Sequence, residues 1–341
     1  MSRHHDTATD TAADADAGPV SGPLPSGPQD ALRRAVRLEW ITIAFLVVSV
    51  IVVGLVAGQS QAMQAAWAED GLSLLPPVAF LVATRIIRRP PSFRHPYGHH
   101  RSIGVAHLVA GTALLLMGGI LFVSSVLGLI QLEKPPVGTT VLFGHQFWAG
   151  WLMIAVMIPT AIIPVILGRL KIRLAEELHD KVLRADADMN KADWSTAVAT
   201  IIGVLGIGVG LWWMDAAAAI VVSASIVYDG ITNVKAAVED LTDTRATRFD
   251  DSEEHPLIDE AEDLARSVPW VRQAAARVRD QGHVFHVEMF VIPQPGQDPT
   301  LEQLMTLRRR LLDIHWKLHD VAVIPVASLP GYLLADEPRL T

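Results

Sequence analysis

Long apolar segments constrain the fold of this chain more than any other sequence feature. Half of the 341 residues are hydrophobic, 19% are charged, and the mean hydropathy is +0.33. That composition is too apolar for one soluble domain of this size. Each segment is near the roughly 20 residues that a helix needs to cross a bilayer. We therefore predict six membrane-spanning helices, at about residues 39–58, 63–86, 102–131, 143–169, 184–213 and 215–235.

Positive charges are concentrated in alternate connections between these segments. Arginines precede the first segment, and Lys and Arg clusters follow the second, fourth and sixth, whereas the other connections hold only Lys134. Lys and Arg stay on the cytoplasmic side of a membrane. We therefore expect both termini and the loops at 87–101 and 170–183 to be cytoplasmic, in a multi-pass protein of the bacterial plasma membrane.

The pattern predicts a division into four parts. Residues 1–30 lack an apolar run and are expected to be a disordered tail. Residues 31–247 form the membrane domain, 248–332 a small cytoplasmic α+β domain with the element order αββαβ, and 333–341 a C-terminal tail. In the α+β domain we expect helices at 256–267 and 299–316, and strands at 271–278, 283–292 and 321–326.

The fifth apolar segment opens with three aspartates. At 100° per residue, one face carries Asp186, Met189, Asn190 and Asp193. The opposite face carries Arg184, Asp188 and Lys191, which can neutralise one another. The first face has no cation of its own, and ionisable groups inside a span mark ion or proton paths. This face is therefore the main candidate for a transport site.

The second segment is acidic as well. Glu69 and Ser73 lie one turn apart on a common face, and Asp70 points about 100° away. The prolines at 76 and 77 cannot donate hydrogen bonds to the carbonyls of Leu72 and Ser73. Freed carbonyls at membrane depth are tolerated where they line a cavity or meet a ligand. A plain proline kink, satisfied by a neighbouring hydroxyl, is the alternative.

A histidine-rich turn separates the second and third segments. It reads His95-Pro-Tyr-Gly-His99, and its proline and glycine favour a tight turn. The imidazoles could bind a cation on the cytoplasmic side. Structural or solvated histidines are the other interpretation.

Six spans, two acidic segments, the His-Pro-Tyr-Gly-His motif and an αββαβ tail together resemble the cation diffusion facilitator family, over about residues 33–327. The resemblance implies a homodimer whose cytoplasmic domains pair in a metallochaperone-like fold. It also implies export of a divalent metal against an inward flow of protons.

The family's transport site uses two residue pairs spaced i, i+4, which fall here on Glu69 with Ser73 and on Met189 with Asp193. With the neighbouring polar residues added, the expected metal ligands are Glu69, Ser73, Asp186, Met189, Asn190 and Asp193. The histidine usual in the family is absent, so manganese or ferrous iron suits this oxygen-rich site at least as well as zinc.

Secondary metal contacts are expected from Asp70, His95 and His99. In the C-terminal domain His286 matches a histidine of the family's regulatory site, but Ile324 and Pro325 stand where the last strand would supply further ligands.

Other functions remain open on the sequence alone. A carrier of another small cation and a membrane scaffold or sensor without transport are the alternatives. An enzyme is not expected, because no nucleophile with its base and no phosphate-binding loop is present. The chain has no cysteine, which removes thiolate ligands. We expect no cofactor besides the transported metal, and as partners protons, membrane lipid and a second copy of the chain, with no nucleic acid.

Overall fold

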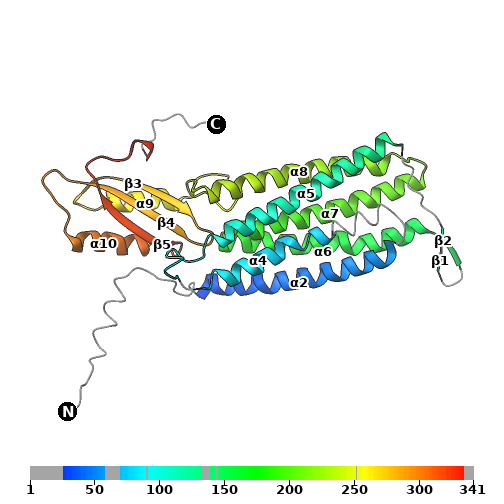
Figure 1. The fold of residues 1–341 in the computed structure, drawn as a ribbon, viewed down its shortest axis with the longest axis horizontal. Helices are drawn as coiled ribbons and strands as arrows, with labels where there is room; N and C mark the ends of the chain where they lie inside the picture. The colour runs from blue at the N-terminus through cyan, green and yellow to red at the C-terminus, as the bar shows by residue number, and fades with distance from the viewer. Residues whose placement is uncertain are drawn as a thin grey trace, which may run out of the picture. The chain divides into compact units, whose positions relative to one another are not determined.

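The computed structural model describes residues 26–57, 70–89, 91–132, 139–142, 145–250 and 252–333. These residues belong to two compact units. One comprises Asp30–Arg85 and Arg101–Thr242, and the other contains Ile86–His100 and the chain from Asp243 onward. Figure 1 shows both units.

Helices alone build the core of the first unit, and they run lengthwise beside one another (Figure 1). Among the described residues, four stretches are long and apolar enough to cross a membrane, namely Gly27–Val52, Ser102–Ile130, Gly150–Leu178 and Ala216–Leu241. The predicted second and fifth spans are not among them. The helices are α2 (Ser26–Ala57), α4 (Leu75–Ile86), α5 (Ser102–Ile130), α6 (Ala149–Leu178), α7 (Lys181–Gly208) and α8 (Met214–Leu241).

The connection predicted at 170–183 is mostly helical. Helix α6 continues to Leu178 and α7 begins at Lys181, because the end of α6 keeps a buried apolar stripe that includes Leu174, Ala175 and Leu178. The cations counted there as loop residues therefore lie on helices.

Two other boundaries in the structure differ from the predicted ones. The fourth segment was expected to begin at about 143, but strands β1 (Thr139–Leu142) and β2 (His145–Trp148) pair antiparallel there, and α6 starts only after them. Residues 26–30 of the predicted disordered tail belong to α2. The remainder of that tail, and residues 334–341 of the C-terminal one, lie outside the described residues.

Helices α5 and α8 approach each other closely along a stripe of glycines. Gly104, Gly111 and Gly118 recur every seven residues of α5, a spacing that keeps one side of a helix against its neighbour. A Cβ atom at Gly118 would lie 2.8 Å from the backbone nitrogen of Val227 in α8. The α5–α8 contact therefore requires a residue without a side chain at Gly118.

The second unit packs two helices with a three-stranded sheet. In chain order its elements are α9 (Leu257–Arg266), β3 (Val271–Asp280), β4 (Phe285–Pro293), α10 (Leu301–Leu312), β5 (Leu318–Pro325) and the short 3-10 helix η1 (Gly331–Leu333). Strand β4 is central, antiparallel to β3 and parallel to β5. Alternate residues of β4, Phe285, Val287 and Met289, enter the apolar core, as strand periodicity predicts.

Candidate cation site

A break in the second apolar segment presents Ser73. The chain is helical at residues 70–72, forms a turn at 73–74, and resumes as α4 at Leu75. Prolines at 76 and 77 follow immediately, and they cannot donate to the carbonyls of Leu72 and Ser73. Ser73 is 1% exposed, and its hydroxyl donates a 2.8 Å hydrogen bond to Oδ1 of Asp193 in α7. The predicted juxtaposition of the second and fifth segments is therefore present at these two residues.

Helix α7 brings further polar groups to the same face. Its start is capped by Asp180, whose carboxylate accepts from the backbone N–H of Leu183 at 2.9 Å. Asn190 is buried, and its Nδ2 donates a 2.8 Å hydrogen bond to the Asp186 carbonyl. This hydrogen bond does not use the side-chain oxygen of Asn190, which is the atom that could bind a cation. A Cβ atom on Gly168 of α6 would lie 3.3 Å from the Cβ of Asn190, so the two helices are close at this level.

Met189 lies in an apolar environment. Its side chain is 1% exposed and packs in a cluster with Ala113, Leu114 and Met117 of α5 and Ile226 of α8, and Leu72 borders the same cluster. The thioether therefore serves packing between α7, α5 and α8 in this structure.

Asp186 is engaged by a cation that sequence reasoning did not consider. Lys171 of α6 places its Nζ 2.5 Å from Asp186 Oδ2 and 3.1 Å from Glu39 Oε2 of α2. All three side chains are at most 1% exposed. The expectation that this face of α7 has no cation holds within the helix but not in the folded unit. A sequence signal existed, because Glu39 and Lys171 interrupt or border apolar segments where charge is expensive.

The opposite face of α7 also contacts polar side chains of α5 and α8. Asp188 Oδ2 accepts from Nδ2 of Asn233 at 3.0 Å, and Oδ1 of Asn233 lies 3.2 Å from Nε2 of His107, which is buried in α5. Lys191 forms an ion pair with Asp229 of α8 at 2.6 Å. Asp188 and Lys191 thus gain contacts to α8 in addition to the electrostatic interaction predicted among Arg184, Asp188 and Lys191.

Of the two acids in the second segment, the structure describes only Asp70. Glu69 lies outside the described residues. Asp70 accepts a 2.8 Å hydrogen bond from the hydroxyl of Ser49 in α2, so its carboxylate has a partner on α2.

The His-Pro-Tyr-Gly-His turn brings its two histidines together. A turn bond joins the Gly98 N–H to the His95 carbonyl, and Gly98 has φ of +75°. The rings of His95 and His99 are 4.4 Å apart between centroids. They form a pair, and Ser92, not an acid, is hydrogen-bonded beside them.

The turn also contacts the sheet of its own unit. The Tyr97 ring meets that of His286 edge-on at 6.1 Å, and His100 lies 5.5 Å from His319 between ring centroids. Burial, together with His319, His283 and His99, lowers the pKa of His100 to about 4.

The C-terminal histidine matched to the family's regulatory site is already paired. His286 Nδ1 lies 2.9 Å from the Asp320 carboxylate, and this hydrogen bond lowers the pKa of Asp320. Glu288, beside it on β4, is bound by Arg277.

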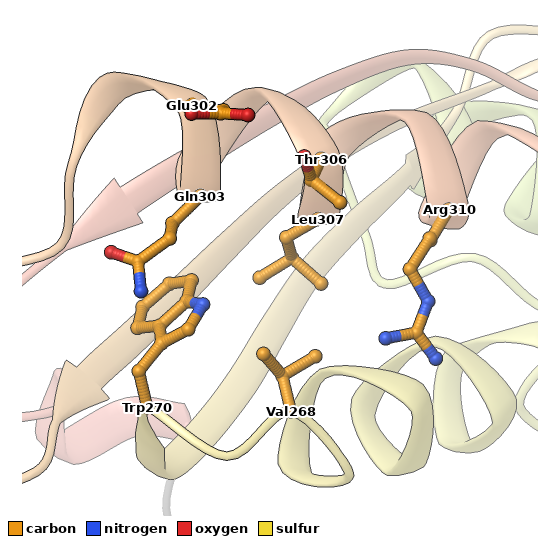
Figure 2. A pocket seen from close by; sticks show the side chains of 7 residues that line it. All are labelled: Val268, Trp270, Glu302, Gln303, Thr306, Leu307 and Arg310. Carbon is orange, nitrogen blue, oxygen red and sulfur yellow. The ribbon is translucent and has the colours of Figure 1, made fainter.

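A small cavity in the C-terminal unit offers no cation site. Figure 2 shows Val268 and Trp270 facing Leu307 and neighbouring side chains of α10. Its volume is about 180 Å³, and Glu302 is the only carboxylate among the residues that line it, so it lacks the several oxygen ligands of a divalent-cation site. Among the residues that the structure describes, no three His, Asp or Glu side chains are grouped closely enough to hold a metal. The described half of the candidate site is therefore Ser73 with Asp193 and Asn190, to which Glu69 would be added.

Comparison with known proteins identifies relatives of the membrane unit. The family profile of the cation efflux transmembrane domain matches residues 39–242. The manganese efflux system protein MneS of Bacillus subtilis is 28% identical over 217 residues, which are 63% of this chain and 70% of MneS. The transporter YdbO of the same organism is 26% identical over 254 residues, or 74% of this chain and 81% of YdbO. The matched profile spans both segments that meet at the Ser73–Asp193 hydrogen bond.

Proposed function

Because this chain belongs to the cation efflux family, also called the cation diffusion facilitator family, we propose that it exports Mn²⁺ in exchange for protons. Membership itself makes the chain a membrane transporter of metal cations and not an enzyme. The choice of metal, the exchange with protons and the residues of the site are the proposal.

The hydrogen bond between Ser73 and Asp193 carries the proposal. It joins a broken helix to a second helix at a buried position, which is where carriers place ion sites. We propose that the cation is held by Glu69, Ser73, the Leu72 carbonyl, Asn190 and Asp193. Asp186 is left out because Lys171 occupies it, and Met189 is left out because it is packed among apolar side chains.

Manganese is favoured by the donor atoms. All five proposed donors are oxygens, which suit Mn²⁺ better than they suit zinc. The relative MneS is named for manganese efflux, which supports the same choice.

Exchange with protons follows from the same carboxylates. A protonated carboxylate is a poor metal ligand, so binding of a proton and of the cation compete at Asp193 and Glu69. That competition couples two opposite flows without a histidine. We also propose a homodimer joined through the C-terminal unit, set in a bacterial plasma membrane with both termini cytoplasmic.

The test is uptake of Mn²⁺ by inverted proteoliposomes under a proton gradient. Asp193→Asn and Glu69→Gln should abolish measurable flux, because losing a buried ligand carboxylate costs several kcal/mol, at least about 3. Asp188→Asn is the matched control. The new amide oxygen can still accept from Asn233, so this variant should keep most of the flux.

The outcomes separate the alternatives. Equal loss in Asp188→Asn and Asp193→Asn would contradict the assignment of the two faces of α7. Full flux in Asp193→Asn would remove the site. Wild-type protein that moves no divalent metal from a panel of Mn²⁺, Fe²⁺ and Zn²⁺ would favour a scaffold or sensor.

A further inference from the structure

A cluster of three buried charged side chains lies next to the proposed cation site and contributes none of its ligands. Glu39, Lys171 and Asp186 come from α2, α6 and α7, and their side chains are 0%, 0% and 1% exposed. Lys171 Nζ is 2.5 Å from the Asp186 carboxylate and 3.1 Å from that of Glu39. One ammonium thus faces two carboxylates, and the cluster has a formal charge of −1.

The cluster is adjacent to the site along α7. Asp186 precedes Asn190 by four residues and Asp193 by seven, and both spacings return to nearly the same face of a helix. A Cβ atom on Gly168 of α6 would lie 3.3 Å from the Cβ of Asn190, and Lys171, one turn further along α6, contacts Asp186. The ammonium is therefore held against the one acid on this face that could otherwise turn toward the cation.

We propose that Lys171 sets the metal affinity of the transport site by keeping Asp186 out of the ligand set. This inference rests on the proposed function. Metal affinity rises with the number of ligand charges in an oxygen site. A carrier must release its cargo as well as bind it, and binding that is too tight slows release. While Lys171 is bound to Asp186, only Glu69 and Asp193 contribute carboxylates to the proposed site. A cation held by these two carboxylates can still be released.

Glu39 explains how a lysine can remain between the helices at this depth. An unpaired ammonium in an apolar interior is costly, and the cost falls when carboxylates surround it. Glu39 is the second carboxylate, and it contacts Lys171 from a helix that supplies no proposed ligand. Lys171 is thus a positioning residue, because it acts on the cation only through Asp186.

The decisive variant is Glu39→Gln/Lys171→Gln. It keeps the cluster at a formal charge of −1, keeps side chains of similar size, and leaves Asp186 without its cation. Equilibrium titration of purified protein with Mn²⁺ should show a dissociation constant at least about tenfold lower than that of the wild type, because one carboxylate ligand is gained. Turnover at saturating Mn²⁺ in proteoliposomes should fall, since release becomes slower.

The matched control is the triple variant Glu39→Gln/Lys171→Gln/Asp186→Asn. It carries the same two changes without the freed carboxylate, and its dissociation constant should return to within about twofold of the wild type. A purely structural cluster would lower turnover in both variants and tighten binding in neither. Unchanged or weaker Mn²⁺ binding by the double variant would overturn the proposal.

A single substitution tests the idea if the double variant does not fold. Asp186→Asn should leave the dissociation constant for Mn²⁺ unchanged, because Asp186 is not a ligand while Lys171 holds it. A rise of about tenfold or more would show that Asp186 binds the cation directly and would also overturn the proposal.

Asp193→Asn separates this inference from the proposed function. Loss of Mn²⁺ binding in Asp193→Asn, together with no tightening in the double variant, would sink the role of Lys171 alone. Retained binding in Asp193→Asn would sink the proposed site itself.

Discussion

Ser73 and Asp193 are 120 positions apart in the chain, yet they form the hydrogen bond on which the candidate site depends. Each is ordinary by itself, because a serine near a proline kink and an aspartate near a helix start have structural explanations. Their contact at a buried position is the observation that supports assigning both to one proposed site.

Replacing Ser73 tests the hydroxyl directly. Ser73→Ala should raise the KM for Mn²⁺ by roughly tenfold or more, since bonds to charged groups contribute about 1.5–3 kcal/mol. Ser73→Asp places a carboxylate at the same position, so its KM for Mn²⁺ should be equal to or lower than that of the wild type. Flux kinetics in proteoliposomes measure both. An unchanged KM in Ser73→Ala would contradict a role of the hydroxyl in binding the cation.

The lowered pKa of His100 predicts that the stability of the C-terminal unit depends on pH. Its pKa is lowered from 6.5 to about 4, chiefly by burial. The fold therefore favours the neutral ring, and the stability linked to it is present above pH 6.5 and is lost as the pH falls toward 4. Between pH 7 and pH 5 the loss should reach up to about 2 kcal/mol.

Calorimetric unfolding of the full chain in detergent at these two pH values measures that loss. His100→Gln cannot be protonated, so the difference between pH 7 and pH 5 should be smaller in this variant. The same pH dependence in both proteins would show that His100 is not the responsible group.

At the scale of elements, α7 is the helix that carries most of the charged residues discussed above, and its two faces have different surroundings. One face meets Ser73 and the Lys171 cluster, and the other meets Asn233 and Asp229 of α8. Charged residues inside a membrane bundle are tolerated when each has a partner. Here the partners come from the neighbouring helices, so α7 depends on the bundle more than the apolar helices do.

Two adjacent glycines of α5 test the packing of α5 on α8. A Cβ atom on Gly118 would lie 2.8 Å from the backbone of Val227, whereas one on Gly119 would meet no atom within 4 Å. Gly118→Ala should therefore lower the stability by about 1–3 kcal/mol. Gly119→Ala should be neutral or slightly stabilising, since alanine has the higher helix propensity.

Thermal unfolding in detergent compares the two variants under identical conditions. A similar melting temperature for Gly118→Ala and wild type would mean that α5 and α8 can separate at little cost.

At the scale of the whole molecule, the distribution of Lys and Arg predicts the orientation in the membrane. The chain has no native cysteine, so single cysteines report their own position. Ser92→Cys and Ser252→Cys should resist an impermeant thiol reagent in intact cells, and Thr139→Cys should react. Permeabilised cells, in which all three should react, provide the control. External labelling of Ser92→Cys would contradict the orientation.

Local pattern was sufficient for much of the fold. Apolar length predicts the four described stretches that can cross a membrane, and the strands expected at 271–278 and 283–292 are found at Val271–Asp280 and Phe285–Pro293. Helical periodicity also placed Asp193 on a face that meets the second segment. These features depend on neighbours in sequence, and their spacing is visible without a structure.

Only the tertiary structure decided which partner each acid on this face of α7 has. Asp186 and Asp193 share a face and look equivalent in the sequence, but Lys171 lies against one and Ser73 against the other. Likewise Met189 stands at a family ligand position, yet α5 and α8 enclose it in apolar side chains. The partner of a buried charge is set by which helix packs beside it and at what depth, and that choice depends on the whole bundle rather than on spacing along one helix.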